Sequence, residues 1–406
     1  MNSKSSILVF INDSLGELDW IAPFIRSSYG KKYTFFIYLY LPGVTNEYRK
    51  QIFNSYFAGS ENDIIFLNEE FEISSLLSTF DRYINSLLRR VSGFSRFLFV
   101  TLRYLFDSLR FLYASVTPSK YHHSFDFIMR DYNLKDSFGL SVLIKNSNDA
   151  KVVVFPHSTA IQSNTINTPK NHPKRISCDL FLENTDLSNL FSDSYQDVFL
   201  SVGSPSFDEL SKRCNKSDEY MLKSFIFITR NCDPRFFGLC YDDCGVIFES
   251  AIKWAYKNNY TIYVKHHPRD PKLGFWRDIQ SNYDCVVEIT ESLNKFSEPL
   301  AFALCFYTSA GLLFTIRKIP VYDVSPYSGN PANLPFHFYN SHGVITHELV
   351  QYGIYQQSSD VVGLLNTLHP DKVQKDGLLQ YNSTVKYFPS ESCLNIDNAL
   401  SKLVSR

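Results

Sequence analysis

Short apolar runs alternate with helical patterns along nearly the whole chain, and this alternation restricts the fold more than any other feature. Each run is five to seven residues long and is rich in Phe, Ile, Val and Tyr. Helical patterns such as 243–258 and 309–317 lie between the runs. Apolar strands that are separated by helices form parallel sheets, so the sequence predicts an α/β fold. We predict strands at 6–12, 34–40, 63–67, 151–156, 178–183, 197–202, 225–229, 260–265, 284–289, 302–307 and 319–323.

The predicted strands fall into two series. The polar stretch 211–219 separates them, and 406 residues are enough for two domains of about 200 residues each. We therefore predict two Rossmann-like, doubly wound domains, at 1–210 and 220–390, that face a central cleft. A C-terminal helix follows within 391–406. Ligands of such sheets bind beyond the carboxyl ends of the strands, so residues at strand ends are the first candidates for a site.

The composition argues against several classes of protein. The 40 Lys and Arg residues nearly balance the 41 Asp and Glu residues, which argues against a generally basic nucleic-acid-binding protein. The eight Cys residues are scattered without a Cys-x-x-Cys pair, which indicates reduced thiols in the cytoplasm and no zinc site. No uncharged apolar run reaches about 18 residues, so we predict no transmembrane helix.

One segment breaks the charge balance, and we call residues 82–120 the basic aromatic segment. It carries seven Lys and Arg residues against a single Asp, with many Phe, Tyr and Leu residues between them. Five arginines recur every seven residues, which keeps them near one face of a helix. Such a helix can pack against the core with a solvated basic edge, dock on an anionic membrane surface or bind an anionic acceptor. The recurring residues are Arg82, Arg89, Arg96, Arg103 and Arg110.

Basic side chains follow two strands of the second series. Thr229 and Arg230 stand at the end of the strand 225–229. Positive charge at the edge of a sheet suits a phosphate or diphosphate, and His can protonate a leaving phosphate near neutral pH. An ordinary surface loop is the alternative. The strand at 260–265 ends with Lys265, and the residues that follow it are His266, His267, Pro268, Arg269 and Asp270.

Hydroxyl and carboxylate side chains stand at two predicted helix starts. Thr308 and Ser309 follow Tyr307 and precede the helix 309–317. Small hydroxyl residues beside free backbone N–H groups form an anion site, although plain N-capping explains one of them. Asp242 and Asp243 begin the helix 243–258, where the helix dipole favours carboxylates and an N-cap is the simple alternative. Together these groups predict a nucleotide-phosphate site in the second domain.

This order of motifs resembles that of bacterial sialyltransferases. Their acidic-acidic-Gly, His-Pro and paired-Ser motifs are matched, in chain order, by Asp242-Asp243-Cys244-Gly245, Lys265-His266-His267-Pro268-Arg269-Asp270 and Thr308-Ser309. Capsule and lipopolysaccharide transferases that use CMP-Kdo have related patterns. The segment 202–208, Val-Gly-Ser-Pro-Ser-Phe-Asp, also resembles the Gly-x-Pro-x-x-Asp segment of many bacterial surface-polysaccharide transferases. The resemblance covers residues 197–325.

The resemblance implies a GT-B fold and an inverting glycosyltransferase that needs neither a metal nor a cofactor. The donor would be CMP-sialic acid or a related CMP-activated 2-keto sugar, and the acceptor a hydroxyl group of lipopolysaccharide or capsule. His267 would bind the CMP phosphate and assist its departure as an acid, while Thr308 and Ser309 would hold the same phosphate. The other implied donor-binding residues are Thr229, Arg230, Lys265, His266, Pro268, Arg269 and Tyr307.

The general base has candidates in both domains. By the resemblance, Asp243 or Asp242 would deprotonate the acceptor hydroxyl. Related enzymes can supply this base from the other domain, where the candidates are Asp13 after the strand 6–12 and His157 with Ser158 after the strand 151–156. A helix cap for Asp13 and a loop hydrogen bond for His157 are the simple structural alternatives.

Other functions fit parts of the same pattern. A CMP-Kdo transferase would use similar motifs. A CDP-alditol phosphotransferase of the teichoic-acid type usually has an Asp before its paired-Ser segment, whereas Phe306 and Tyr307 precede Thr308 here. A non-catalytic glycan-binding protein would have no need to keep His267, Ser309 and both Asp residues.

The expected partners follow from these functions. They are a CMP-sugar donor and a glycan or glycolipid acceptor, with an anionic membrane surface as a further candidate through the basic aromatic segment, and no nucleic acid. We expect a cytoplasmic protein that lies peripherally at the inner face of the inner membrane. The oligomeric state stays open.

Overall fold

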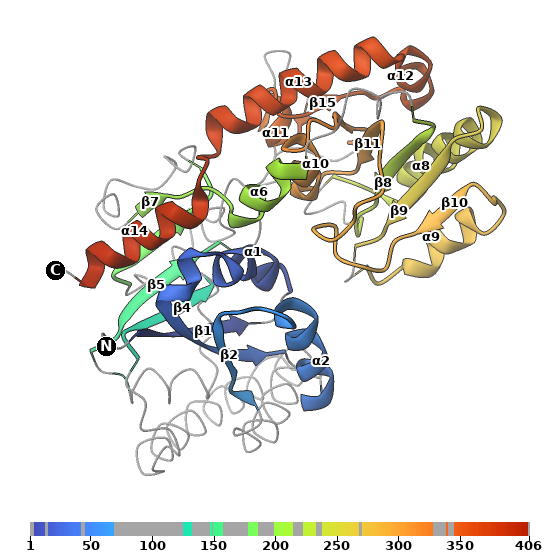
Figure 1. Cartoon of the computed structure of the whole chain (residues 1–406). Coiled ribbons are helices and arrows are strands. Elements are labelled where there is room, and N and C mark those ends of the chain that lie inside the picture. The colour runs from blue at the N-terminus through green and yellow to red at the C-terminus, as the bar shows by residue number, and fades with distance from the viewer. Residues whose placement is uncertain are drawn as a thin grey trace, which may run out of the picture.

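The chain forms two α/β domains, each built on a parallel sheet (Figure 1). This confirms the predicted fold class. The basic aromatic segment lies outside the described residues. The computed structural model describes residues 4–12, 15–41, 45–68, 125–131, 147, 149–156, 178–185, 199–213, 222–232, 238–267, 270–327, 338–339 and 345–404.

The first sheet has the strand order β3-β2-β1-β4-β5-β6-β7, so the order reverses between β1 and β4. Residues Ile7–Ile11 of β1 are at most 1% exposed, because apolar clusters cover both faces of the sheet. Burial on both faces explains why this strand reads as a continuous apolar run without alternation. The strands are β1 (Ser5–Asn12), β2 (Tyr33–Tyr40), β3 (Asp63–Phe66), β4 (Phe127–Asp131), β5 (Lys151–Phe155), β6 (Leu180–Glu183) and β7 (Phe199–Ser201).

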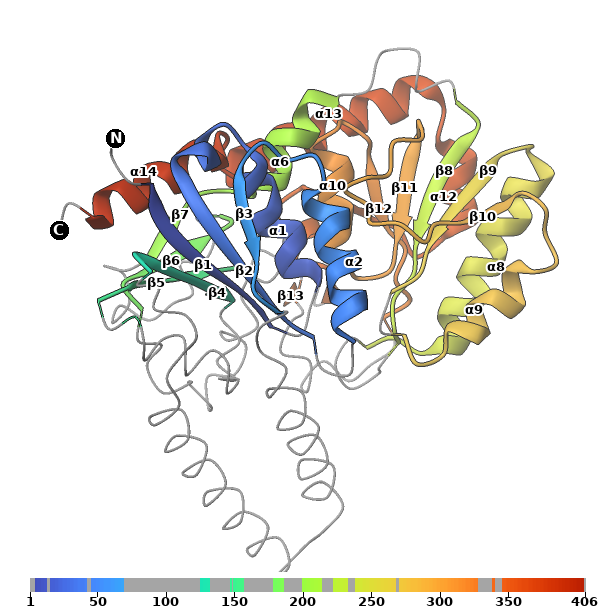
Figure 2. The same ribbon diagram turned by 60° about the horizontal axis from the view of Figure 1, so that its bottom comes forward.

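Helix α1 covers one face of the first sheet. Its Trp20 ring stacks on Phe155 of β5 at a centroid distance of 5.5 Å. Helices α1 and α2 lie on the side of this sheet that is turned toward the second domain (Figure 2). The helical elements are α1 (Leu15–Arg26), η1 (Tyr29–Lys32), α2 (Asn46–Phe57), α6 (Pro205–Leu210) and η5 (Ser211–Arg213).

The second sheet repeats this topology with the order β10-β9-β8-β11-β12-β15, reversing between β8 and β11. Its strands are β8 (Ser224–Ile228), β9 (Thr261–Lys265), β10 (Val286–Glu288), β11 (Phe302–Cys305), β12 (Val321–Asp323) and β15 (Gln356–Gln357). A short antiparallel pair joins β13 (Phe338–Tyr339) to β14 (Ile345–Thr346). The helical elements are α8 (Tyr241–Lys257), α9 (Leu273–Gln280), η7 (Ser309–Gly311), α10 (Leu312–Thr315), α11 (Glu348–Gln351), α12 (Val361–Thr367) and α13 (Pro370–Tyr387).

The helix predicted at 309–317 is shorter than expected. It is a 3-10 turn, η7, followed by the single turn α10, which ends at Thr315. Lys318 then adopts a positive φ of 64°, and Pro320 directly precedes β12. This turn redirects the chain into the next strand, so the helix has no room to continue.

The last helix, α14 (Ser392–Val404), returns to the first domain, as Figure 1 shows. Its Asp397 accepts hydrogen bonds from Lys32 Nζ at 2.5 Å and from Tyr33 Oη at 2.9 Å. The chain therefore crosses between the domains twice, once before β8 and once between α13 and α14.

The Gly-x-Pro-x-x-Asp segment stabilises this second crossing. Gly203 has a φ of 83°, and a Cβ at this position would lie 2.1 Å from the carbonyl oxygen of Pro389. Pro205 occupies the start of α6, where its missing N–H costs nothing. Asp208 accepts hydrogen bonds from the backbone N–H groups of Ser392 at 3.0 Å and Cys393 at 2.8 Å, and so caps α14.

Candidate functional site

The carboxyl ends of β8, β9 and β11 lie side by side in the second sheet and bring most of the predicted donor residues to one edge. Thr229 and Arg230 follow β8, His266 and His267 follow β9, and the 307–309 turn follows β11. The strand order reverses between β8 and β11, and such a reversal opens the crevice in which ligands of doubly wound sheets bind.

The turn after β11 is held from several sides. Tyr307 is only 7% exposed and has a positive φ of 20°, which is uncommon for a bulky residue. Its backbone N–H donates to Ser325 Oγ at 2.9 Å and to Asp323 Oδ1 at 3.4 Å. Arg230 donates to the carbonyl oxygen of Tyr307, and its guanidinium lies 5.2 Å from the centre of the tyrosine ring. These contacts fix the position of the turn before any ligand binds.

Asp323 is the buried acceptor at the base of this turn. It is 0% exposed and accepts hydrogen bonds from Ser325 Oγ and Tyr327 Oη, both at 2.5 Å. Burial raises the pKa of Asp323, and the hydrogen bonds from Ser325 and Tyr327 oppose that rise. Asp323 therefore orders the loop after β12 against the turn after β11.

Two further residues that sequence reasoning missed support the same turn. The His347 ring lies 4.5 Å from the ring of Tyr307, and Tyr355 Oη donates to the carbonyl oxygen of Thr308 at 3.1 Å. His347 Nδ1 accepts a hydrogen bond from the N–H of Leu349 at 2.9 Å, which assigns the proton of a neutral ring to Nε2. The sequence held a signal only for Asp323, which ends a predicted strand.

Thr308 and Ser309 occupy different positions in the turn. Thr308 Oγ1 accepts from the N–H of Ala310 at 3.2 Å and so caps η7, which is the simple N-cap alternative. Ser309 is the first residue of η7 and is half-buried. Because η7 and α10 are short, their combined dipole contributes little, and anion binding here depends on individual N–H and hydroxyl groups.

The side chains of the two adjacent histidines lie in different environments. His266 is 7% exposed, with Nδ1 at 2.9 Å from Thr229 Oγ1 and Nε2 at 3.2 Å from Gln280 Oε1. Burial lowers the pKa of His266, so this ring stays neutral near pH 7. His266 therefore joins β8 to α9, and His267 is the more accessible of the two histidines.

Lys265 contacts a loop of its own domain. Its Nζ donates to the carbonyl oxygens of Glu291 at 2.5 Å and Thr290 at 3.2 Å. Burial lowers the pKa of Lys265, and the carboxylate of Asp19 in the first domain opposes this shift. In this structure Lys265 orders the loop after β10, which faces the first domain.

Asp242 and Asp243 are exposed in the first turn of α8. Asp243 Oδ2 accepts from the thiol of Cys240 at 2.8 Å, and Cys240 is the N-cap of the helix. These carboxylates contact solvent and their own helix start. Pro268, Arg269, Asp13, His157 and Ser158 lie outside the described residues, so the structure does not place them.

Comparison with known proteins agrees with this architecture. No family model matches the chain, and no curated protein matches its sequence. Solved structures match over nearly its whole length. MnaA of S. aureus with UDP is 14% identical, with a TM-score of 0.56 over 99% of this chain and 97% of that one. The UDP-GlcNAc 2-epimerase of Neisseria meningitidis, bound to UDP-GlcNAc, is 13% identical, with a TM-score of 0.55 over 98% and 100%.

A third match is the wall teichoic acid polymerase TagF. It is 11% identical, with a TM-score of 0.52 over 99% of this chain and 89% of that one. The chain has the GT-B fold. Identities this low show the fold alone, and the chemistry of a site depends on its own residues.

The carboxyl edge of the first sheet carries buried carboxylates. Asp131 ends β4, Glu183 ends β6, and Glu17 lies in the first turn of α1 directly after β1. All three are at most 2% exposed. Burial holds the pKa of Glu183 well above its usual range, and its Oε1 has no hydrogen-bond partner among the described residues.

The described part of the chain holds neither a cluster of metal-ligating side chains nor a helix that could span a membrane. No group of three or more His, Cys, Asp and Glu side chains there is close enough to hold a metal ion. None of the helices in the described ranges has the length and the apolar character that are needed to span a bilayer.

Proposed function

We propose that the chain is a glycosyltransferase that takes a sugar from a cytidine nucleotide donor and transfers it to a hydroxyl group of a surface glycan. The donor sugar is sialic acid or a related 2-keto sugar on CMP. The observation that carries this proposal is the gathering of Arg230, His267 and the 307–309 turn at the reversal point of the second sheet. The motif order that resembles sialyltransferases supports the choice of nucleotide.

The proposed reaction breaks the bond between the anomeric carbon and the phosphate oxygen of CMP. Negative charge develops on that phosphate, and Arg230 with the N–H and hydroxyl groups of Thr308 and Ser309 stabilises it. His267 donates a proton to the leaving phosphate. The acceptor oxygen attacks from the opposite face and forms the new glycosidic bond with inversion, and a carboxylate takes its proton. No metal is needed, because side chains supply the positive charge.

The proposed proton acceptor is Asp243 or Asp242, and the alternatives in the first domain are Asp13 and His157, to which the structure adds the buried Glu183. An exposed carboxylate is a weak base, whereas burial makes Glu183 a stronger one once it is ionised. Steady-state kinetics of Asp243→Asn and Glu183→Gln decide between them. We expect the true base to lower kcat by about a hundredfold or more with little change in the KM for the donor.

A CDP-alditol phosphotransferase is the second candidate function. The fold similarity to TagF favours it, since a TagF crystal was soaked with CDPG. Against it stand Phe306 and Tyr307, which occupy the positions before Thr308 where that enzyme type usually has an Asp. CMP-Kdo transfer and non-catalytic glycan binding are the remaining alternatives.

Thermal-shift titration with a donor panel tests the proposal. The panel contains CMP-sialic acid, CMP-Kdo, CDP-glycerol and UDP-GlcNAc, and we expect the largest stabilisation with a CMP-sugar. A larger shift with CDP-glycerol favours the phosphotransferase, and one with UDP-GlcNAc removes the choice of cytidine. Absence of any shift with the cytidine nucleotides contradicts both transferase proposals.

The proposal includes a place in the cell. We propose a cytoplasmic enzyme at the inner face of the inner membrane, with the basic aromatic segment as the contact to anionic lipid. Cosedimentation with anionic vesicles tests this contact after replacement of Arg89, Arg96, Arg103 and Arg110 by Gln. Reduced binding is expected, and unchanged cosedimentation supports a helix that packs on the core.

A further inference from the structure

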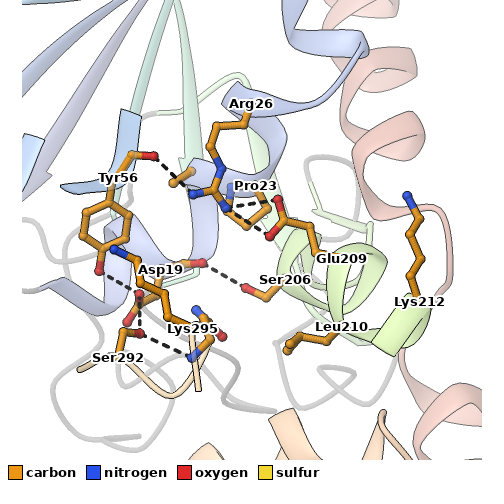
Figure 3. Close-up of a pocket in the computed structure, with 12 residues that line it drawn as sticks. Asp19, Pro23, Arg26, Tyr56, Ser206, Glu209, Leu210, Lys212, Ser292 and Lys295 are labelled. Atoms are coloured by element: carbon orange, nitrogen blue, oxygen red, sulfur yellow. Dashed lines mark hydrogen bonds and ion pairs between the residues drawn. The ribbon is translucent and has the colours of Figure 1, made fainter. Parts of the chain in front are cut away.

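A cavity of about 500 Å³ lies where the two domains meet (Figure 3). Helices α1 and α2 and the α6–η5 segment of the first domain line it, together with the 292–295 loop of the second domain. Its volume lies within the range of about 300–1,000 Å³ that is typical of small-molecule sites. We call it the junction cavity.

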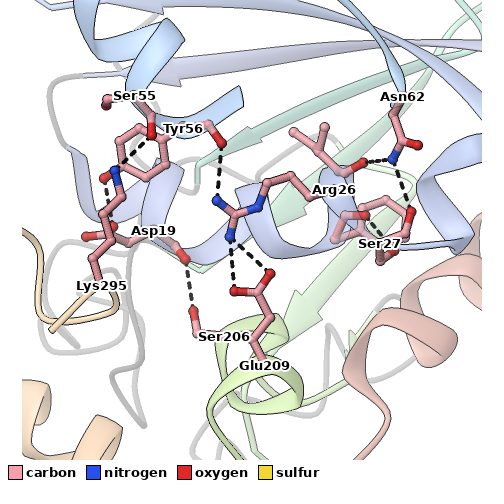
Figure 4. Close-up of polar contacts among 11 residues, drawn as sticks. Asp19, Arg26, Ser27, Ser55, Tyr56, Asn62, Ser206, Glu209 and Lys295 are labelled. Atoms are coloured by element: carbon pink, nitrogen blue, oxygen red, sulfur yellow. Dashed lines mark hydrogen bonds and ion pairs between the residues drawn. The ribbon is translucent and has the colours of Figure 1, made fainter. Parts of the chain in front are cut away.

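The walls of the junction cavity are polar and already ordered (Figure 4). Arg26 Nη2 donates to both carboxylate oxygens of Glu209 at 3.0 Å, and Arg26 Nη1 donates to the carbonyl oxygen of Tyr56 at 3.1 Å. Asp19 Oδ1 accepts from Tyr56 Oη at 2.7 Å and from Ser292 Oγ at 3.1 Å. The last bond crosses between the domains. Such ordered polar groups can form hydrogen bonds to a polar ligand without rearrangement.

The charges in the cavity leave an excess of positive charge. Arg26 and Glu209 neutralise each other in a bidentate pair. Lys295 donates to the neutral carbonyl oxygen of Ser55 at 2.8 Å and lies 5.2 Å from the centre of the Tyr56 ring, near Asp19. Lys212 has no ion-pair partner in the described ranges. The lining therefore carries three cations against two carboxylates, which favours an anionic ligand.

We propose that the junction cavity binds an anionic monosaccharide, such as a sugar phosphate. Lys212 and Lys295 neutralise the anionic group, and Asp19, Ser206 and Ser292 accept or donate hydrogen bonds to the sugar hydroxyls. Because the lining comes from both domains, an occupant stabilises the domain arrangement of this structure. None of the proposed donor residues lines this cavity, so binding there does not depend on the proposed function.

The cavity is linked to the donor strand β9. Lys265 Nζ, at the end of β9, holds the carbonyl oxygens of Thr290 and Glu291, and Ser292 follows directly in the chain. The carboxylate of Asp19 acts electrostatically on Lys265. A ligand in the cavity is therefore expected to change the affinity for a donor nucleotide, and the nucleotide must change the affinity for the ligand by the same factor.

Isothermal titration calorimetry on the full chain tests the proposal. The probes are N-acetylglucosamine 1-phosphate, free N-acetylglucosamine and inorganic phosphate. We expect the sugar phosphate to bind more tightly than either component alone, and the double variant Lys212→Ala/Lys295→Ala to weaken it by about tenfold or more. The matched control is Lys257→Ala/Lys375→Ala, which removes two exposed lysines from other surfaces and leaves the affinity unchanged.

A His267→Ala variant separates the junction cavity from the donor site. Unchanged affinity for the sugar phosphate in this variant supports the cavity, whatever the cytidine nucleotides do. Loss of binding in His267→Ala, with full binding in the double lysine variant, overturns the proposal because the probe then occupies the donor site. Equal weakening in the control double variant, or no binding of any probe at millimolar concentration, also overturns it.

Discussion

The carboxyl edges of the two sheets differ in which polar groups they leave accessible. At the second sheet, Arg230, His267 and Ser309 are half-buried and offer cationic and hydroxyl groups. At the first sheet, Glu17, Asp131 and Glu183 are carboxylates with at most 2% exposure. The two edges belong to domains of nearly the same topology, so the fold does not cause the difference.

Under the proposed function, the carboxyl edges of the two sheets have different tasks. In that function, the held turn at Tyr307 and its neighbours supply the preformed positive charge and hydrogen-bond donors that a leaving phosphate needs. A proton acceptor needs a raised pKa, which burial supplies to a carboxylate such as Glu183. A transferase requires both the groups that stabilise the leaving phosphate and a proton acceptor. The difference between the two edges can therefore be tested one residue at a time.

The largest expected effect comes from the two histidines after β9. His267→Ala should lower transfer by about 10²–10⁴-fold with an unchanged melting temperature, because it removes a proton donor from a half-buried position. His266→Ala should instead lower the stability by about 1 kcal/mol, because it breaks the contacts to Thr229 and Gln280. Kinetics and thermal melting of both variants measure the difference. A His267→Ala enzyme with wild-type turnover would remove the acid from the mechanism.

The second-largest effect is expected from loss of Asp323, the hydrogen-bond acceptor beneath the 307–309 turn. Asp323→Ala leaves the hydroxyl groups of Ser325 and Tyr327 without their acceptor, and should cost about 3 kcal/mol of unfolding free energy. Urea denaturation measures this cost. The milder Asp323→Asn should fold and raise the KM for the donor more than it lowers kcat. Equal donor affinity in Asp323→Asn and wild type would contradict the role of this residue in ordering the turn.

The third test uses the raised pKa of Glu183. In the folded state this carboxyl keeps its proton at pH values where the unfolded chain loses it. Wild-type stability should therefore fall as the pH rises above the usual glutamate pKa, by at most about 1.4 kcal/mol per pH unit. Glu183→Gln cannot ionise, so its stability relative to wild type should increase between acidic and neutral pH.

Urea denaturation at several pH values measures this trend, with the exposed Glu298→Gln as the control for loss of a charge. A difference between Glu183→Gln and wild type that stays constant with pH would show that folding does not raise the pKa of Glu183, and the contrast between the two edges would lose its main support.

The smallest expected effect concerns a buried hydrogen bond beside the carboxyl edge of the first sheet. Trp20 Nε1 donates to Asn184 Oδ1 at 2.6 Å in a buried position directly after β6. Trp20→Phe keeps most of the apolar volume and should destabilise the protein by about 1 kcal/mol, since the amide loses a donor. Thermal melting measures the loss. A simultaneous loss of donor binding would mean that the two edges are coupled more tightly than their separate contacts indicate.

The strands could be predicted from the sequence because a parallel strand that is buried on both faces must be apolar throughout. The eleven predicted runs match strands of the two sheets to within a few residues. Four strands escaped prediction, namely β4 and β15 in the two sheets and β13 and β14 in the antiparallel pair. β4 has three apolar residues, Phe127, Ile128 and Met129, before Arg130 and Asp131, and β15 consists of Gln356 and Gln357, so neither carries an apolar run of five residues or more.

The residues at the carboxyl edge of the second sheet could be predicted from their positions at strand ends. The carboxyl ends of parallel strands meet at one edge of a sheet, whatever the conformation of the loops. Those positions could not tell His266 from His267, since only packing against Thr229 and Gln280 decides which ring turns inward. His347 and Tyr355 come from distant elements, and their contact with the 307–309 turn depends on how α11 and β15 pack.

The amino-acid sequence by itself therefore determined the two α/β domains and the polar groups at the end of each strand, because both depend on local pattern and on the fixed geometry of parallel sheets. Only the tertiary structure decided which of those groups are buried, which carboxylates gather at the first edge, and that α1, α6 and the loop after β10 enclose a polar cavity. Burial and charge pairing arise from contacts between residues far apart in the chain, and no local pattern records them.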